Sequence, residues 1–305
     1  KVTIKNAEGQ EILSKEGEQE ITFLCERTYE EGDRIVVESS EKNCFLWLQV
    51  DEVLGRSMIY LKDAMEYIIP FGEKRLNKSP KAFCGSEHFI WLKRAKEFER
   101  KTYRNLALNV NDQSCSTTCY PHVSANVETR GEAVFAAVNG VDGVTANEGH
   151  WKWPFQSWGI NRREDAAIKI DFGREVEIDR IILYTRADFP HDSWWEQATI
   201  RYSDGSTEKI SMKKSILPHE FMIEKRKVSW IELCDLIKAE DPSPFPALTQ
   251  IEALLHQIND ISTQTLSIGG KTALDRVMKQ DFRCGCWLTE KPETAMKAIT
   301  RNLDR

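Results

Sequence analysis

The stretch Ala167-Ile-Lys-Ile-Asp-Phe-Gly173 alternates apolar and polar side chains, which is the pattern of a β-strand with one buried face. A second apolar run, Asp179-Arg-Ile-Ile-Leu-Tyr184, follows it, and a Ser203-Asp-Gly-Ser206 turn separates the runs 198–202 and 207–212. The glycine of that turn tolerates the positive φ that a tight hairpin demands. Helical spacers are missing between these runs, so the pattern favours antiparallel β structure over parallel βαβ units.

The residues before this region follow the same rhythm of short apolar runs bounded by turns. The runs are 34–38, 45–50, 57–61, 66–69, 89–92 and 106–110, and they predict an all-β sandwich. Residues 91–104 fit either a short helix or an edge hairpin, and residues 248–254 fit either a strand or part of a helical stripe. Beyond Gly269-Gly270, residues 272–282 and 293–303 predict helices.

The fold class that follows is mainly β, with tandem β-sandwich domains and a short helical C-terminal tail. Polar, loop-like residues lie between Asn111 and His122, so we expect the domain boundary there. The expected domains are residues 1–112, an N-terminal β-sandwich; residues 113–258, a second sandwich; and residues 259–305, a helical tail to which the sequence assigns no role.

Composition narrows the classes of function. The 305 residues include 41% hydrophobic and 30% charged residues, as in globular proteins, and the net charge of −6 comes from intermingled acids and bases. The basic footprint of a nucleic-acid-binding surface is missing, and no apolar run is long enough to cross a bilayer. The sequence does not fix the oligomeric state. It also leaves the compartment open, because spare thiols favour a reducing setting whereas a sugar-binding role favours export.

The eight cysteines are too sparse and irregular for a disulfide-stapled scaffold. Cys115-x3-Cys119-x2-His122 offers three possible zinc ligands. It lacks a CxxC knuckle and a second half, so packed thiols are the favoured interpretation.

Tryptophans are unusually dense between residues 151 and 195. We assign Trp158 to the core, because large aromatic side chains are mostly buried. The segments His150-Trp-Lys-Trp-Pro154 and Arg186-Ala-Asp-Phe-Pro-His-Asp-Ser-Trp-Trp195 combine aromatic and polar groups, as ligand-binding loops do. Aromatic faces against sugar C–H surfaces, with polar groups that hydrogen-bond hydroxyls, would make a sugar site.

The order of several segments resembles a known family. Ala136-Ala-Val-Asn-Gly-Val-Asp-Gly143, Trp158, the two strands quoted first and Thr249-Gln-Ile-Glu-Ala253 together resemble the discoidin-like, or galactose-binding-domain-like, jelly rolls. Bacterial family 32 carbohydrate-binding modules belong to that group. The resemblance covers about residues 121–255. For the N-terminal part, only the strand pattern suggests a related sandwich.

The resemblance implies a jelly roll that binds a glycan with loops at one end and holds a structural calcium ion. Carried over to this sequence, the calcium ligands would be Asn139, Asp142, Val144, Asn147 and a group on the closing strand, Gln250 or Glu252. Asn139 and Val144 would contribute backbone carbonyls. The family's closing glutamate falls on Gln250 here, and losing one carboxylate weakens a calcium site. The alternative is an Asp142-Gly143 turn that needs no ion, because aspartate accepts hydrogen bonds from nearby amides.

We therefore expect non-catalytic glycan binding through the two aromatic loops. The expected ligand-binding residues are His150, Trp151, Trp153, Arg186, Asp188, His191, Trp194 and Trp195.

Two alternatives stay open. Asp188, His191, Asp192 and Glu196 would offer an acid/base set in the accessory region of a glycoside hydrolase-type enzyme, although no nucleophile, metal-protease or nucleotide motif occurs in the chain. Exposed tryptophans also anchor protein interfaces, so a protein-interaction β-sandwich is the other alternative.

Overall fold

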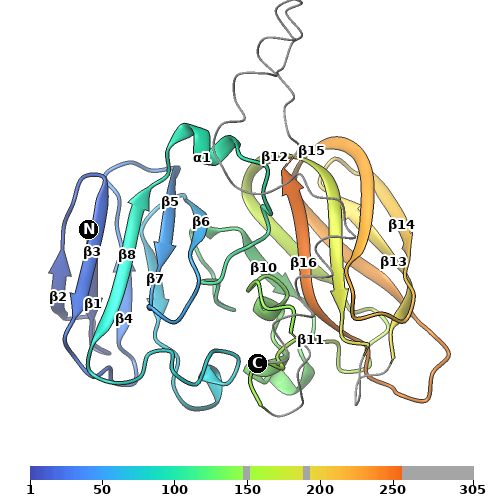
Figure 1. Cartoon of the computed structure of the whole chain (residues 1–305), viewed down its shortest axis with the longest axis horizontal. Coiled ribbons are helices and arrows are strands. Elements are labelled where there is room, and N and C mark those ends of the chain that lie inside the picture. The colour runs from blue at the N-terminus through green and yellow to red at the C-terminus, as the bar shows by residue number, and fades with distance from the viewer. Residues whose placement is uncertain (147–151, 188–192, 256–305) are drawn as a thin grey trace, which may run out of the picture. The chain divides into compact units, whose positions relative to one another are not determined.

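The computed structural model describes residues 1–146, 152–187 and 193–255. Its strands form three sheets, and every pairing between strands is antiparallel (Figure 1). This confirms the expected mainly β, antiparallel architecture. The described residues fall into one compact unit that contains both predicted sandwiches.

The N-terminal part is a sandwich of two sheets. A four-stranded sheet has the order β2-β1-β4-β7, and a five-stranded sheet has the order β3-β8-β5-β6-β9. Inward-facing side chains from both sheets make one apolar core, which includes Ile4, Ile35, Tyr67, Leu48 and Ile90. The strands are β1 (Val2–Lys5), β2 (Glu11–Lys15), β3 (Glu20–Cys25), β4 (Arg34–Val37), β5 (Cys44–Gln49), β6 (Ser57–Leu61), β7 (Met65–Ile68), β8 (His88–Arg94) and β9 (Cys119–Tyr120).

The second part contains a seven-stranded sheet with the order β11-β16-β12-β15-β13-β14, and β10 pairs with β12 beside this path. Two strands are long, β12 (Ile168–Thr185) and β15 (His219–Lys238). The first half of β12 pairs with β10 and its second half pairs with β16. This one strand therefore has a different neighbour on that edge at each of its ends. The other strands are β10 (His122–Ala125), β11 (Trp158–Gly159), β13 (Trp195–Tyr202), β14 (Thr207–Ser211) and β16 (Ala247–Leu255).

Short helices connect these strands. They are the 3-10 helices η1 (Gly72–Arg75), η2 (Thr129–Gly131), η3 (Ala133–Phe135) and η4 (Ala137–Gly140), and the α-helix α1 (Glu97–Lys101). Strand β8 and helix α1 resolve the ambiguity of residues 91–104, since the strand ends at Arg94 and the helix begins at Glu97. Residues 248–254 lie within β16, so the strand alternative was right.

One predicted strand was wrong. Residues 106–110 form a loop, in which Leu106 and Ala107 are buried in the core of the second sandwich. The Leu106 amide donates to the Ala253 carbonyl at 2.7 Å, and the Asn109 amide donates to the Val141 carbonyl at 3.0 Å. Leu106 and Ala107 are therefore buried as part of a connecting segment that packs on the core. A buried connecting segment and a buried strand cannot be told apart from apolar periodicity alone.

The change from one sandwich to the other occurs at Pro121. Cys119 and Tyr120 pair with β6 of the N-terminal sandwich, whereas His122 and the residues after it pair with β12. The Tyr120–Pro121 peptide bond is cis. In sheet pairing, then, the N-terminal sandwich extends past residue 112, where we expected its end. The predicted helices of the tail lie outside the described residues.

Candidate functional site

The two loops predicted to bind a ligand converge at their described ends. The first loop leads into β11, and the second connects β12 to β13. Strand β11 pairs with β16, and β16 pairs with β12, so the strand ends that carry the loops are close together.

Arg186 ties the second loop to the first. Its guanidinium donates a hydrogen bond to the backbone carbonyl of Phe155, and its backbone amide donates to the Ala247 carbonyl at 2.9 Å. The side chain is fully buried. We expected Arg186 to hydrogen-bond a ligand, but the structure directs it into the protein, where a planar guanidinium can hold two segments together.

Two of the tryptophans belong to the core. Trp158 and Trp195 are both 0% exposed, and their ring centroids are 6.4 Å apart. Trp158 also donates from Nε1 to the Val127 carbonyl at 2.9 Å. The prediction for Trp158 is confirmed. Trp195 was expected to stack on a ligand, and this is corrected: it is the first residue of β13 and its ring faces the apolar core.

Trp153 and Trp194 remain accessible. Trp153 is 38% exposed, and the half-buried Trp194 has the Lys214 ammonium 5.6 Å from its ring centroid. His150, Trp151, Asp188 and His191 lie outside the described residues, as does Asp192 of the catalytic alternative.

The turn predicted to bind calcium is closed by hydrogen bonds within the protein. Asp142 accepts from the Val144 amide at 2.8 Å with Oδ1 and from Gln156 Nε2 at 3.0 Å with Oδ2. Gln250 Oε1 accepts from the Gly143 amide at 3.1 Å. Direct hydrogen bonds thus tie the turn to Gln156 and to Gln250 of β16, with the side-chain oxygens of Asp142 and Gln250 accepting from N–H groups.

Asn139 was expected to contribute its backbone carbonyl. Its side chain is held within the protein: Nδ2 donates to the Ala133 carbonyl at 2.9 Å, and Oδ1 accepts from Asn77 Nδ2 at 2.9 Å. Glu252 is half-buried, and its pKa is raised by burial and by the charge of Glu220. Asn147 lies outside the described residues.

A lysine from the N-terminal part supplies positive charge near this turn. Lys78 is 8% exposed, and its charge acts on the equally buried Asp142. Burial raises the pKa of Asp142 to about 6, an increase that Lys78, Gln156 and the Val144 amide partly offset. Calcium prefers several anionic oxygens, and the described part of this turn offers one carboxylate with the ammonium of Lys78 close by. The charges of the described side chains therefore do not favour calcium.

The thiols considered as zinc ligands do not gather into a site. Cys115 is exposed and Cys119 is buried. His122 Nδ1 lies 2.9 Å from Asp112 Oδ1, and this hydrogen bond raises the pKa of His122. Within the described ranges, the group of three metal-ligating side chains that does gather is Asp51, Glu52 and His88, in the N-terminal sandwich.

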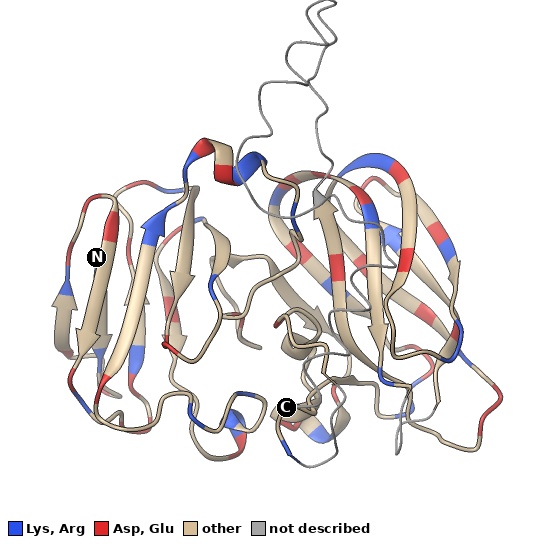
Figure 2. Ribbon diagram, viewed as in Figure 1, with Lys and Arg blue, Asp and Glu red and all other residues tan. Residues whose placement is uncertain are grey.

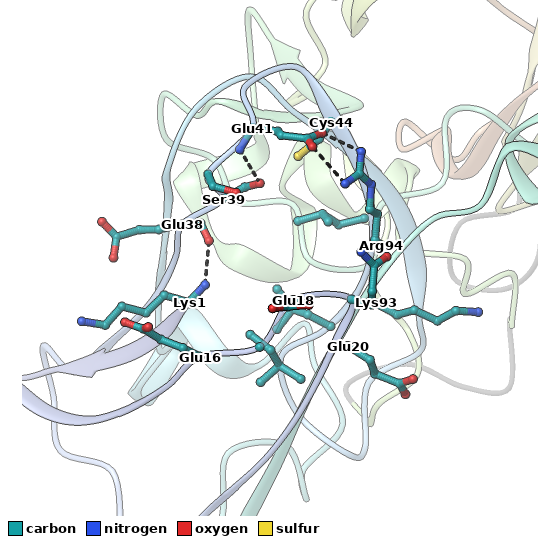
Figure 3. A pocket seen from close by; sticks show the side chains of 16 residues that line it. Lys1, Glu16, Glu18, Glu20, Glu38, Ser39, Glu41, Cys44, Lys93 and Arg94 are labelled. Carbon is teal, nitrogen blue, oxygen red and sulfur yellow. Dashed lines mark hydrogen bonds and ion pairs between the residues drawn. The ribbon is translucent and has the colours of Figure 1, made fainter.

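Two cavities open near the N-terminal sandwich. One, of about 440 Å³, is lined mainly by charged side chains, and the Glu41–Arg94 ion pair at 2.6 Å crosses its wall (Figure 3). The other, of about 550 Å³, is lined by apolar residues such as Tyr67, Phe71 and Val138, with the buried Lys78 and Asp112. Sequence reasoning identified neither, because their walls come from distant segments.

Lys and Arg are interspersed with Asp and Glu over both parts of the described ribbon (Figure 2). This agrees with the intermingled charges of the sequence. Among the described residues, no helix combines the length and apolarity needed to span a bilayer.

Comparison with known proteins gives structural likeness at low sequence identity. No family model matches the chain. No curated protein matches it either.

Similar solved structures include sugar-binding modules. A chitosan-binding module of a chitosanase/glucanase from Paenibacillus sp. IK-5 is 17% identical, with a TM-score of 0.33, and the match covers 49% of this chain and 98% of the module. The family 32 carbohydrate-binding module of NanJ from C. perfringens, in complex with galactose, is 13% identical, with a TM-score of 0.34, over 43% of this chain and 91% of that one. A fucose-binding module from Streptococcus pneumoniae is 16% identical, with a TM-score of 0.37, over 50% and 98%.

Proposed function

We propose that the chain binds a glycan, without chemistry of its own, at the rim formed by residues 150–158 and 186–195. The observation that carries the proposal is the Arg186–Phe155 hydrogen bond, which holds the two aromatic loops together. The Trp158–Trp195 contact fixes the ends of the same loops in the core. A rigid base under two loops lowers the conformational cost of ligand binding.

The accessible groups suit a sugar. Trp153 offers an exposed aromatic face, and Lys152 beside it is exposed as well. Trp194 lies at the end of the other loop, with Lys214 over its ring. An apolar face flanked by hydrogen-bond donors is the combination that a pyranose ring requires.

The proposal assigns no reaction to this rim. Of the four residues considered as an acid/base set, only Glu196 lies in the described ranges, and it is exposed on β13. The proposal predicts that hydrolysis of a panel of aryl glycosides and polysaccharides stays at background. Turnover that disappears in both Asp188→Asn and Asp192→Asn would show that the second loop is catalytic.

The direct test is a glycan array with the full chain, followed by titration calorimetry on the best glycan. We expect weak affinity, with a Kd on the order of 0.1 to 1 mM, because shallow polar sites bury little area. Trp153→Ala should reduce the affinity by about tenfold or more, since a stacking platform contributes roughly 1.4 kcal/mol. Phe98→Ala is the matched control, because Phe98 is an aromatic residue of helix α1 that is 67% exposed.

Two results would reject the proposal. One is an array without a hit at millimolar sugar, and the other is equal affinity of wild type and Trp153→Ala. Capture of a protein partner that free sugar does not displace would favour the protein-interaction alternative.

The calcium ion is a separate question with its own measurement. We expect the chain, once freed of metal with EDTA and dialysed, to have the same melting temperature with and without added calcium, because Asp142 and Gln250 already accept hydrogen bonds from N–H groups. A ligand that binds only the folded state raises that temperature by mass action. An increase in calcium that Asp142→Ala abolishes would establish the ion that the family resemblance implies.

A further inference from the structure

Asp51, Glu52 and His88 form a compact group of ligand atoms in the N-terminal sandwich. Asp51 and Glu52 follow strand β5, and His88 is the first residue of β8. One ligand atom from each side chain lies within 4.8 Å of the other two. His88 Nδ1 and Asp51 Oδ2 are 3.8 Å apart, which is too long for a hydrogen bond.

His88 is buried without hydrogen bonds to either ring nitrogen. The residue is 1% exposed, and neither Nδ1 nor Nε2 has a hydrogen-bond partner among the described residues. Tyr29 stacks on the imidazole, with ring centroids 4.0 Å apart and planes 21° from parallel. Buried polar groups normally have hydrogen-bond partners. His88 is an exception that needs an explanation, because stacking holds its ring in place while an unpaired nitrogen faces the Asp51 carboxylate.

Backbone amides hold both carboxylates in position. Asp51 accepts from the Val53 amide at 2.9 Å and from the Phe83 amide at 2.8 Å. Phe83 adopts a left-handed backbone with φ of 57°, unusual for an aromatic residue, and its amide reaches Asp51 from there. Glu52 Oε2 accepts from the Phe89 amide at 2.9 Å. Each carboxylate oxygen has a second lone pair, so these bonds orient the groups and leave them able to bind a cation.

We propose that Asp51, Glu52 and His88 bind a divalent transition metal ion, with zinc as the occupant. Two carboxylates and an imidazole nitrogen form a ligand set that zinc accepts, whereas calcium and magnesium select oxygen alone. Ligands about 2.1 Å from a tetrahedral zinc lie about 3.4 Å apart, so side-chain shifts of roughly an ångström close the site. Glu52 is exposed, which gives the ion a path from solvent and leaves a coordination position for water.

The test is zinc binding by the full chain. After treatment with EDTA and dialysis, zinc is titrated in competition with a chromogenic chelator, and metal content is measured by mass spectrometry. We expect one zinc per chain and a higher melting temperature with zinc than without it. Cobalt in place of zinc should give visible d–d absorption that reports ligation by the protein.

Glu52→Gln is the decisive variant, because its side chain is exposed and the substituted amide oxygen can still accept from the Phe89 amide. We expect its zinc affinity to fall by about tenfold or more, and His88→Gln to lose binding. Glu87→Gln is the matched control, since Glu87 is exposed next to His88 and is not a ligand. Cys115→Ser should also bind as wild type does.

Substoichiometric zinc in the wild type, or equal affinity in Glu52→Gln and Glu87→Gln, would overturn the assignment. If His88→Gln fails to fold, the Glu52→Gln comparison still decides. Glycan binding does not enter this test, because the metal group and the aromatic loops belong to different sandwiches.

Discussion

The ammonium group of Lys78 and the carboxyl group of Asp142 are both buried, and the charge of each acts on the pKa of the other. Burial lowers the pKa of Lys78 and raises that of Asp142, while their mutual attraction opposes both shifts. Lys78 belongs to the segment after helix η1, and Asp142 to the turn after η4. A lysine of the N-terminal part thus stabilises the ionised form of an aspartate in the second part.

The first prediction is a pH dependence of stability that comes from Asp142. Its pKa is about 6 in the folded protein and near 3.9 in an unfolded chain, so the folded state holds this proton more tightly. The contribution of this group is fully present below about pH 4 and is lost as the pH rises through 6, which amounts to about 3 kcal/mol. In urea unfolding at several pH values, wild type should lose stability relative to Asp142→Asn between about pH 3.5 and 6.5. A difference that stays constant with pH would contradict this.

The second prediction concerns the Lys78–Asp142 pair. Lys78→Met leaves a buried carboxylate without its cation, and we expect a loss of about 3 kcal/mol in the free energy of unfolding near neutral pH. Lys78→Met combined with Asp142→Leu should recover most of that loss, because an apolar pair has no charge to desolvate. Lys209→Met is the control, since Lys209 is exposed on β14 and should change stability by less than about 0.5 kcal/mol. Additive effects of the two substitutions would show that the groups are not coupled.

Periodicity predicted the strands that have one buried face. Strand β12 follows the alternation of its first half, and the Ser203–Ser206 turn joins β13 to β14 as expected. Strand β3 alternates exposed and buried residues from Glu20 to Cys25, a signal that the sequence contains and that we did not use. Strand β2 is almost wholly exposed, and its two apolar residues are adjacent rather than alternating, so it gave no periodic signal.

The site was harder to predict because its contacts join distant segments. A charged Arg186 at the end of a strand resembles an exposed residue, and only the fold shows its hydrogen bond to Phe155. Lys78 likewise gives no local sign of a partner in another sandwich. Which of Trp194 and Trp195 is buried depends on where strand β13 begins, because consecutive residues of a strand face opposite sides. The strand begins at Trp195, and only that side chain enters the core.

The third prediction separates the structural tryptophans from the accessible one. Trp158→Ala or Trp195→Ala removes a fully buried side chain and should cost about 3 to 5 kcal/mol in the free energy of unfolding. Trp153→Ala should cost less than about 1 kcal/mol, because its side chain is 38% exposed. Chemical denaturation measures all three. A large loss in Trp153→Ala would place that side chain in the core and weaken its role in sugar stacking.

The fourth prediction concerns the link between the loops. Arg186→Leu should destabilise the protein by about 2 to 3 kcal/mol, because the buried Phe155 carbonyl loses its charged donor. Glycan affinity should fall as well, since the loops are no longer held together. Arg201→Leu is the control: Arg201 is 46% exposed at its side chain, and its pairs with Glu232 and Asp235 should contribute at most about 1 kcal/mol. Equal stability of the two variants would show that the Arg186–Phe155 hydrogen bond does not stabilise the folded protein.

The fifth prediction tests the close approach of Gly173 to Tyr120. Gly173 has a φ of +69°, and a Cβ there would lie 2.3 Å from Tyr120 Cγ. Gly173→Ala therefore combines backbone strain with a clash, and we expect a loss of about 3 kcal/mol in urea unfolding. Gly205→Ala is the matched control, because its φ is +87° with open space around it, so it should cost only about 1 kcal/mol of backbone strain. Adding Tyr120→Ala to Gly173→Ala removes the two nearest atoms and should bring its effect toward that of the control. Equal losses for the two glycine variants, with no change on adding Tyr120→Ala, would mean that strand β12 does not pack against Tyr120 in solution.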